Sequence, residues 1–502
     1  MTSFFGRWAV VCSILLTQAC TTLGPDYVEP QVDWLQSWEA EQYGQAQAAA
    51  TGQPDLSSWW NVFNDPLLNQ LIETARVKNP GLRIAGLRIA ESRALLGIAT
   101  GSQYPQYQQA NGSLARINSG ESGGEHQQFN NYDLGFDVAW EADFWGKYRR
   151  AIESADAAFF ASVTNQQNVQ VILAAQVTQL YFSYRTTTKQ IEIAKMNADL
   201  QQRSYDITGA RFSSGQDSEL DLQQAKAQYL ATKSSIPTLE IAQRQIKNAL
   251  GALLGRAPGQ FEELTAEVQE LPVLESSVVE SVPAGLLISR PDIRTAALQV
   301  AAQSAQVGLA ETDIYPSISL FGTIGWSGNS LAGSSDATNL AFGPSFTWNV
   351  LNYGRIKNNV RVQDARLQQT IENYQNSVLL AAKEVDDAAI SVVKIEEQQQ
   401  LLAESLASSE RALKLSTSRY QEGYSDFQRV LDAQRSLAAT SNNYIATKGA
   451  RINAIIAFYK ALGAGWTPVT SESAIDEDTR ELMQQRTDWG DLLNTPLPEF
   501  TK

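Results

Sequence analysis

The first half of this sequence recurs in the second half, and this repeat limits the fold more than any other feature. Three stretches match at offsets of 211, 208 and 208 residues. They are Asn79–Pro105 with Arg290–Pro316, Gly135–Gly146 with Gly343–Gly354, and Arg211–Tyr229 with Arg419–Leu437. The period is too long for a solenoid. The repeat indicates a duplication in which each half contains a helix, two strands and two long helices.

The strands are predicted from apolar residues at every second position, as at Tyr132, Leu134, Phe136, Val138 and Trp140. We expect strands at about 106–117, 130–143, 316–327 and 340–351, the first by analogy with its twin in the second half. Segments of about ten residues are typical of membrane β-barrels, although a half-buried hairpin in a soluble sheet is the alternative. Four strands cannot close a barrel in lipid, so a membrane-spanning form must oligomerise.

The long helices are predicted from heptads. Apolar residues follow 4-3 spacing from Tyr374 to Ile395, and a helix from about Gly354 to Glu422 would be about 100 Å long. Ser213–Asp217 and Gly423–Asp426 are expected to form helix–helix turns at the far tips. Pro237 is predicted to kink or break the fourth long helix.

Composition excludes several classes of function. A net charge of −15 argues against nucleic-acid binding. Two Cys and one His exclude a disulfide framework and a Cys/His zinc cluster, and three Met with one His argue against copper or silver handling. The sequence shows no nucleophile–base pair, metal site or phosphate loop, so we expect neither an enzyme nor a cofactor.

The N-terminus is predicted to be a signal peptide over residues 1–19, with Arg7 before the apolar segment Trp8–Leu16. Ala19 followed by Cys20 resembles the lipobox of bacterial lipoproteins, in which Cys20 would carry a covalent lipid. Thr17 stands where that motif usually has Leu. An ordinary signal peptide is the alternative.

Several motifs, taken with their order and duplication, resemble the outer membrane factor family, the TolC-like exit ducts. They are SWWNVFNDPLLNQLIETARVKNP (Ser58–Pro80), a Tyr-Pro before the strands, VLDAQRSL (Val430–Leu437) and LGAGW (Leu462–Trp466). The sequence is most similar to the lipoprotein branch of OprM-like and NodT proteins. The resemblance implies a mainly α protein with a small β part. It also implies a homotrimer with a 12-stranded outer membrane barrel on a 12-helix periplasmic α-barrel.

The repeat and the resemblance together divide the chain into a signal peptide, two repeats and the parts of a mid-height equatorial domain. The expected divisions are the signal peptide 1–19, a lipid-anchored N-terminal segment 20–78, the first repeat 79–255, an equatorial linker 256–289, the second repeat 290–466 and an equatorial tail 467–502.

The resemblance also implies roles for residues at the helix tips. Asp432 matches an aspartate that forms a ring in the pore, Arg429 stands where some relatives have a second aspartate, and Arg419 with Tyr420 matches a gating pair. Tyr424 and Asp426 are further gate candidates by position. The expected adaptor contacts are Arg211, Gly215, Arg419 and Gly423. Asp432 could instead be a solvated helix residue, and Arg419 with Tyr420 could cap the helix C-terminus.

The function that the resemblance implies is a passive exit duct of a tripartite efflux system. It would export drugs or other small molecules with an RND-type inner-membrane pump and a periplasmic adaptor. The expected location is the Gram-negative outer membrane, with a lipid anchor and a part that extends into the periplasm. The alternatives are a type I secretion duct for proteins or peptides, and a lipid-anchored envelope spacer without a pore.

Overall fold

The computed structural model describes residues 21–37, 56–119, 127–259, 261, 264, 270–272, 287–329 and 337–498. Its elements follow the duplication seen in the sequence. The first half contains η1 (Asp33–Ser37), η2 (Leu56–Phe63), α2 (Pro66–Lys78), α3 (Pro80–Gly101), β1 (Tyr107–Ser119), β2 (Gln127–Glu141), α4 (Lys147–Ser213) and α5 (Glu219–Leu253). The second half contains α7 (Pro291–Thr312), β3 (Ser317–Gly328), β4 (Ala337–Thr347), α8 (Arg355–Gln421), α9 (Phe427–Ala461), α10 (Ser471–Ala474) and α11 (Glu477–Arg486).

The four strands form one antiparallel sheet in the order β1-β2-β3-β4. The pairing of β2 with β3 joins the two repeats, and it places Asp137 opposite Thr323. The strands lie within a few residues of the expected ranges, but β4 ends at Thr347 although the alternation continues through Trp348 and Val350. Beyond the strand, the Trp348 indole donates a hydrogen bond to the carbonyl oxygen of Ile314, at 3.0 Å.

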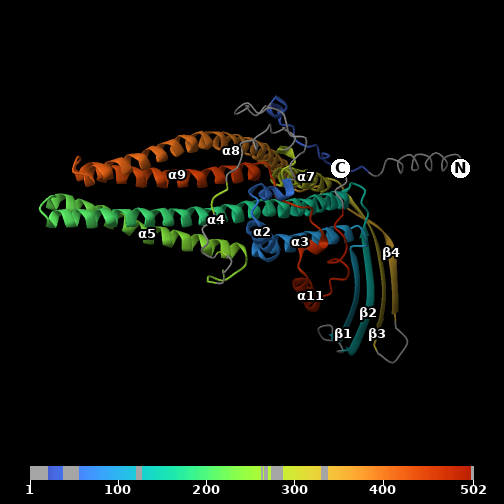
Figure 1. Cartoon of the computed structure of the whole chain (residues 1–502). Helices are drawn as coiled ribbons and strands as arrows, with labels where there is room; N and C mark the ends of the chain where they lie inside the picture. The colour runs from blue at the N-terminus through green and yellow to red at the C-terminus, as the bar shows by residue number, and fades with distance from the viewer. Residues whose placement is uncertain are drawn as a thin grey trace.

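The long helices lie side by side as two hairpins, which extend away from the sheet toward one end of the molecule (Figure 1). α4 packs against α5 and α9, and α9 packs against α8, so α5 and α8 are the outer helices of this row. The predicted heptad seam is confirmed, since its members from Tyr374 to Val392 are buried and Ile395 is half-buried. Among the described residues, no helix combines the length and apolar character that crossing a membrane requires.

Of the predicted kink or break at Pro237, the break is wrong, because α5 continues through this residue. Proline removes one backbone donor and leaves the carbonyl of residue 233 without its helical partner. Lys233 and Pro237 are both exposed, so water can hydrate that oxygen. Packing along α4 supports the helix on the other side.

The largest core lies where the segment before α3 packs on the middle of the long helices. Trp59 stacks on Tyr459 of α9 at 5.1 Å between ring centroids. Asp65 caps the start of α2 and also binds Arg185 of α4, at 2.6 Å. The C-terminal tail packs on α3, where Arg93 donates to the carbonyl oxygens of Leu492, Thr495 and Pro496. The N-terminal segment thus packs near the middle of α4, whereas the tail packs on α3 and on the part of α4 nearer the strands.

Candidate functional site

The candidate site lies at the far tips of the two helical hairpins, where the chain reverses direction. The turn between α4 and α5 contains Gly215 with φ +71°, and the turn between α8 and α9 contains Gly423 with φ +82°. Glycine adopts this left-handed conformation without steric cost, and it commonly ends helices in this way. The two predicted helix–helix turns are therefore confirmed, and both glycines serve the backbone of their turn.

An ion pair closes the first turn on itself. Arg211 lies in the last turn of α4, and its Nε lies 3.1 Å from each carboxylate oxygen of Asp217. The hydrogen bonds to Asp217 raise the pKa of Arg211, against the lowering effect of partial burial. Next to this pair, Ser218 and Asp221 form a capping box at the start of α5. The first tip is thus held by its own side chains.

Tyr420, at the end of α8, connects the second hairpin to the first. Its side chain is buried, with 4% of the residue exposed, and its hydroxyl donates to Oδ2 of Asp217. The hydroxyl also lies 3.5 Å from Oγ1 of Thr208, and the Tyr420 ring centroid lies 4.8 Å from Cζ of Arg211. Burial and the hydrogen bond to Asp217 raise the pKa of Tyr420 to about 12. We call Thr208, Arg211, Asp217 and Tyr420 the tip lock.

A small apolar cluster lies directly behind the tip lock. The Tyr420 ring packs against Phe427 at 5.5 Å between centroids, in a tilted arrangement. The other buried members of the cluster are Ala225, Leu413, Val430 and Leu431. Because these residues come from α5, α8 and α9, the cluster holds the ends of both hairpins together.

The other gate candidates are not part of the tip lock. Arg419 is exposed in the last turn of α8, so the arginine beside Tyr420 is Arg211 rather than Arg419. Tyr424 is 76% exposed, and Asp426 caps α9 by accepting from the backbone N–H of Arg429 at 3.4 Å. Asp432 is also exposed, and it accepts from Gln428 at 3.0 Å. Ring roles for Asp432 and Arg429 involve further copies of the chain and stay predictions.

Asp217 and Thr208 belong to the site but are not among the residues predicted from the sequence. The sequence predicts only a turn at Asp217, although this residue lies six positions after Arg211 with a glycine between them. The position 208 residues later is Ser425, so the repeat itself marks Asp217 as a difference between the two tips. Thr208 carries no comparable signal in the sequence. Cys20 lies outside the described residues.

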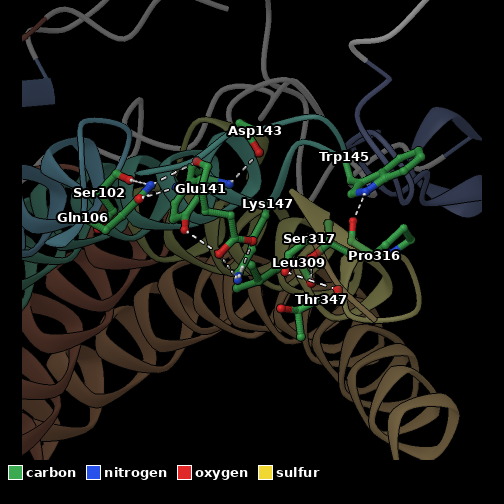
Figure 2. Close-up of polar contacts among 12 residues, drawn as sticks. Ser102, Gln106, Glu141, Asp143, Trp145, Lys147, Leu309, Pro316, Ser317 and Thr347 are labelled. Atoms are coloured by element: carbon green, nitrogen blue, oxygen red, sulfur yellow. Dashed lines mark hydrogen bonds and ion pairs between the residues drawn. The ribbon is translucent and has the colours of Figure 1, made fainter. Parts of the chain in front are cut away.

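At the opposite end, side chains fix the joint between the strands and the helices (Figure 2). Gln106 donates to the carbonyl oxygen of Glu141 at 3.2 Å and accepts from the N–H of Glu141 at 2.7 Å. Lys147 pairs with the Glu141 carboxylate at 3.2 Å, and the Trp145 indole donates to the carbonyl oxygen of Pro316 at 2.8 Å. Hydrogen bonds and an ion pair thereby connect the sheet to the start of α4. The Trp145 indole also connects this joint to the segment between α7 and β3.

Comparison with known proteins identifies the family. Residues 71–256 and 282–464 match the model of the family described as outer membrane efflux protein. The chain is 31% identical over 468 residues to the cation efflux system protein CusC of Escherichia coli K12, covering 90% of this chain and 98% of that protein. It is 29% identical over 436 residues to the pyoverdine export outer membrane protein OpmQ of Pseudomonas putida KT2440, covering 86% and 91%.

A solved structure gives the same result. The outer-membrane channel OprN superimposes with a TM-score of 0.79 at 30% identity, covering 89% of this chain and 99% of that one. The expectation of a mainly α TolC-like fold with a small sheet is therefore confirmed. The chain belongs to the outer membrane efflux protein family, whose members are outer membrane efflux channels.

Proposed function

We propose that this chain forms, with two further copies, the exit duct through which a tripartite system exports small molecules. The observation that carries the proposal is the tip lock, in which one hydroxyl of the second hairpin holds a carboxylate of the first. A static spacer would not need a charged, hydrogen-bonded contact at the narrow end of its helices. A duct does need a closure there, because an open pore would let solutes leak.

The proposed partners are an inner-membrane pump and a periplasmic adaptor that contacts the exposed hairpin tips. The duct holds no energy source of its own, so an RND-type inner-membrane pump would drive transport through a periplasmic adaptor. Arg419 and Tyr424 remain exposed at the second tip and would meet the adaptor together with the turn around Gly215. The covalent lipid on Cys20 would add an anchor in the outer membrane.

The cargo that we propose is organic, and cationic drugs are the first class to test. OpmQ is named for pyoverdine export and CusC for cation efflux, so the family accommodates different cargoes. Metal cations are a second candidate, favoured by the 31% identity to CusC. Soft metals prefer thioether and imidazole ligands, and the chain has only three Met and one His.

Dye accumulation tests the proposal directly. A host with this chain as its sole duct of the type, and with its cognate pump and adaptor, should accumulate less ethidium than the same host with an empty vector. If the two hosts accumulate equal ethidium but the host with this chain is less sensitive to silver, the cargo is a metal cation rather than an organic molecule. Equal ethidium and equal silver sensitivity, with trimers present in the outer membrane, would contradict small-molecule export.

A further inference from the structure

The first described residues, Thr21–Asp26, are docked against the helices at the base of the strands. The N–H of Leu23 donates to the carbonyl oxygen of Trp145 at 3.1 Å. On the other side, the Ser304 hydroxyl donates to the carbonyl oxygen of Pro25 at 3.3 Å. We call this segment the strap. It lies between the start of α4 in the first repeat and α7 in the second.

Glycines allow the backbones to approach closely where the strap crosses. A Cβ atom on Gly146, which has φ +77°, would lie 2.7 Å from Cγ2 of Thr22. A Cβ on Gly308 of α7 would lie 2.6 Å from the carbonyl oxygen of Leu23. Real Cβ atoms do not come this close to other atoms, so larger residues at Gly146 or Gly308 would displace the strap.

The Arg150 side chain also holds the strap, because most of its N–H donors bind strap residues. We call Gly146, Gly308 and Arg150 together the seat. Only 4% of this side chain is exposed. Its Nε donates to the carbonyl oxygen of Leu23 at 2.8 Å, and its Nη2 donates to that of Gly24 at 3.0 Å and to the carboxylate of Asp26 at 2.9 Å. Nη1 pairs with Glu153 at 2.7 Å. A buried guanidinium with this many charge-assisted bonds holds its partner in one geometry.

The duplication shows which part of this seat is specific to the strap, because the two glycines recur in the other repeat and Arg150 does not. At the repeat offsets, Asn358 stands in place of Arg150, and Gly97 corresponds to Gly308. A Cβ on Gly97 would meet no atom within 4 Å. Gly354, with φ +81°, likewise corresponds to Gly146, so the glycines recur at both joints and only the arginine that binds the strap is confined to the first.

We propose that the seat formed by Gly146, Gly308 and Arg150 positions the start of the mature chain relative to the strands. Trp145, which binds Leu23 through its carbonyl oxygen, also binds Pro316 just before β3 through its indole. Two hydrogen bonds therefore connect the strap to the base of the sheet. The seat fixes the segment that directly follows Cys20 in the sequence, so a lipid on Cys20 would enter the membrane beside the strand ends. The lipid part of this inference rests on the proposed modification of Cys20.

A matched pair of glycine substitutions tests the seat in the full-length trimer. Thr21→Cys provides a thiol for a nitroxide label, which should give an immobilised spectrum in the otherwise unchanged protein. Gly308→Ala should convert it to a mobile spectrum, and it should speed amide exchange in the peptide containing Leu23 about tenfold or more. Gly97→Ala adds the same methyl group at the related helix position, into open space, and should change neither measurement.

A second variant separates the role of Arg150 from helix stability. Arg150→Ala should also release the strap, whereas Arg149→Ala removes an adjacent charge that pairs with Asp143 and should leave the strap docked. An immobilised label and slow exchange in both Gly308→Ala and Arg150→Ala would overturn the proposed seat.

Thiol labelling of the mature protein without added cysteines reports separately on Cys20. A lipidated Cys20 takes no label, whereas a free Cys20 takes one label per chain. A free thiol with a docked strap would refute lipidation and its membrane role and leave the seat itself standing.

Discussion

The two hairpin tips arose from one duplicated sequence, but different contacts hold them. In the first tip, Arg211 binds Asp217 within its own turn. In the second, the related positions are Arg419 and Ser425, which cannot form an ion pair. The first tip is complete in itself, whereas the second depends on Tyr420 reaching across to Asp217.

The helix that follows each turn also differs between the two tips, and again the first tip has more local contacts. Ser218 and Asp221 form a reciprocal capping box at the start of α5. The corresponding residues of α9 are Asp426 and Arg429, and only Asp426 provides a cap. The second hairpin therefore begins with fewer local constraints. We therefore expect that opening the duct moves the second hairpin, while the first hairpin stays in place.

Removing the shared carboxylate should have the largest effect. Asp217→Ala leaves Arg211 without its counter-ion and Tyr420 without its acceptor. Hydrogen bonds to charged groups are each worth about 1.5–3 kcal/mol, so we expect open-channel probability to rise about tenfold or more. Single-channel recording of trimers in planar bilayers measures this change. Ser425→Ala, at the related position of the second tip, is the control, and equal open probability in the two variants would contradict the comparison.

Removing one hydroxyl should have a smaller effect of the same sign. Tyr420→Phe retains the ring against Arg211 and Phe427 but loses the hydrogen bond to Asp217. The expected cost to the closed state is that of one hydrogen bond to a charged group, about 1.5–3 kcal/mol. Leakage of a large antibiotic into intact cells provides the measurement. Tyr424→Phe changes an exposed tyrosine four residues away and should leave leakage at the wild-type level.

The sequence predicted local structure well because periodicity and glycine act over short distances. The heptads of α8, the alternation in β2 and the glycines of both tips are all patterns within one segment. The tip lock could not be found in this way, since Tyr420 and Asp217 are 203 residues apart. The Arg150 contact to the strap spans 127 residues and has no counterpart in the second repeat. Such pairs depend on how whole helices pack, which neighbouring residues do not encode.

The strands show a second contrast between the halves. The polar face of β2 carries Asp133, Asp137 and Glu141, and the residues opposite them on β3 are Ser327, Thr323 and Ser319. Asp137→Thr should lower the preference for cations over anions by about twofold, because carboxylates along a pore attract cations. Adding Thr323→Asp returns the charge to the neighbouring strand and should restore the preference. Reversal potentials under a salt gradient measure both variants, and a double variant that stays low would show that position on β2 matters beyond charge.

A change of pH should have the smallest effect on conductance, because the effect appears only above about pH 10. Burial and the bond to Asp217 raise the pKa of Tyr420 to about 12 from the ordinary value of 10.0. The folded protein therefore holds this proton more tightly than an unfolded chain does, and the contribution of the tip lock is complete below pH 10. It declines as pH rises toward 12, because a phenolate beside Asp217 is repelled and donates no hydrogen bond. Conductance should be flat between about pH 6 and 9 and should rise above about 10. Tyr420→Phe should lack this alkaline rise, and a rise that persists in Tyr420→Phe would assign it to a group outside the tip lock.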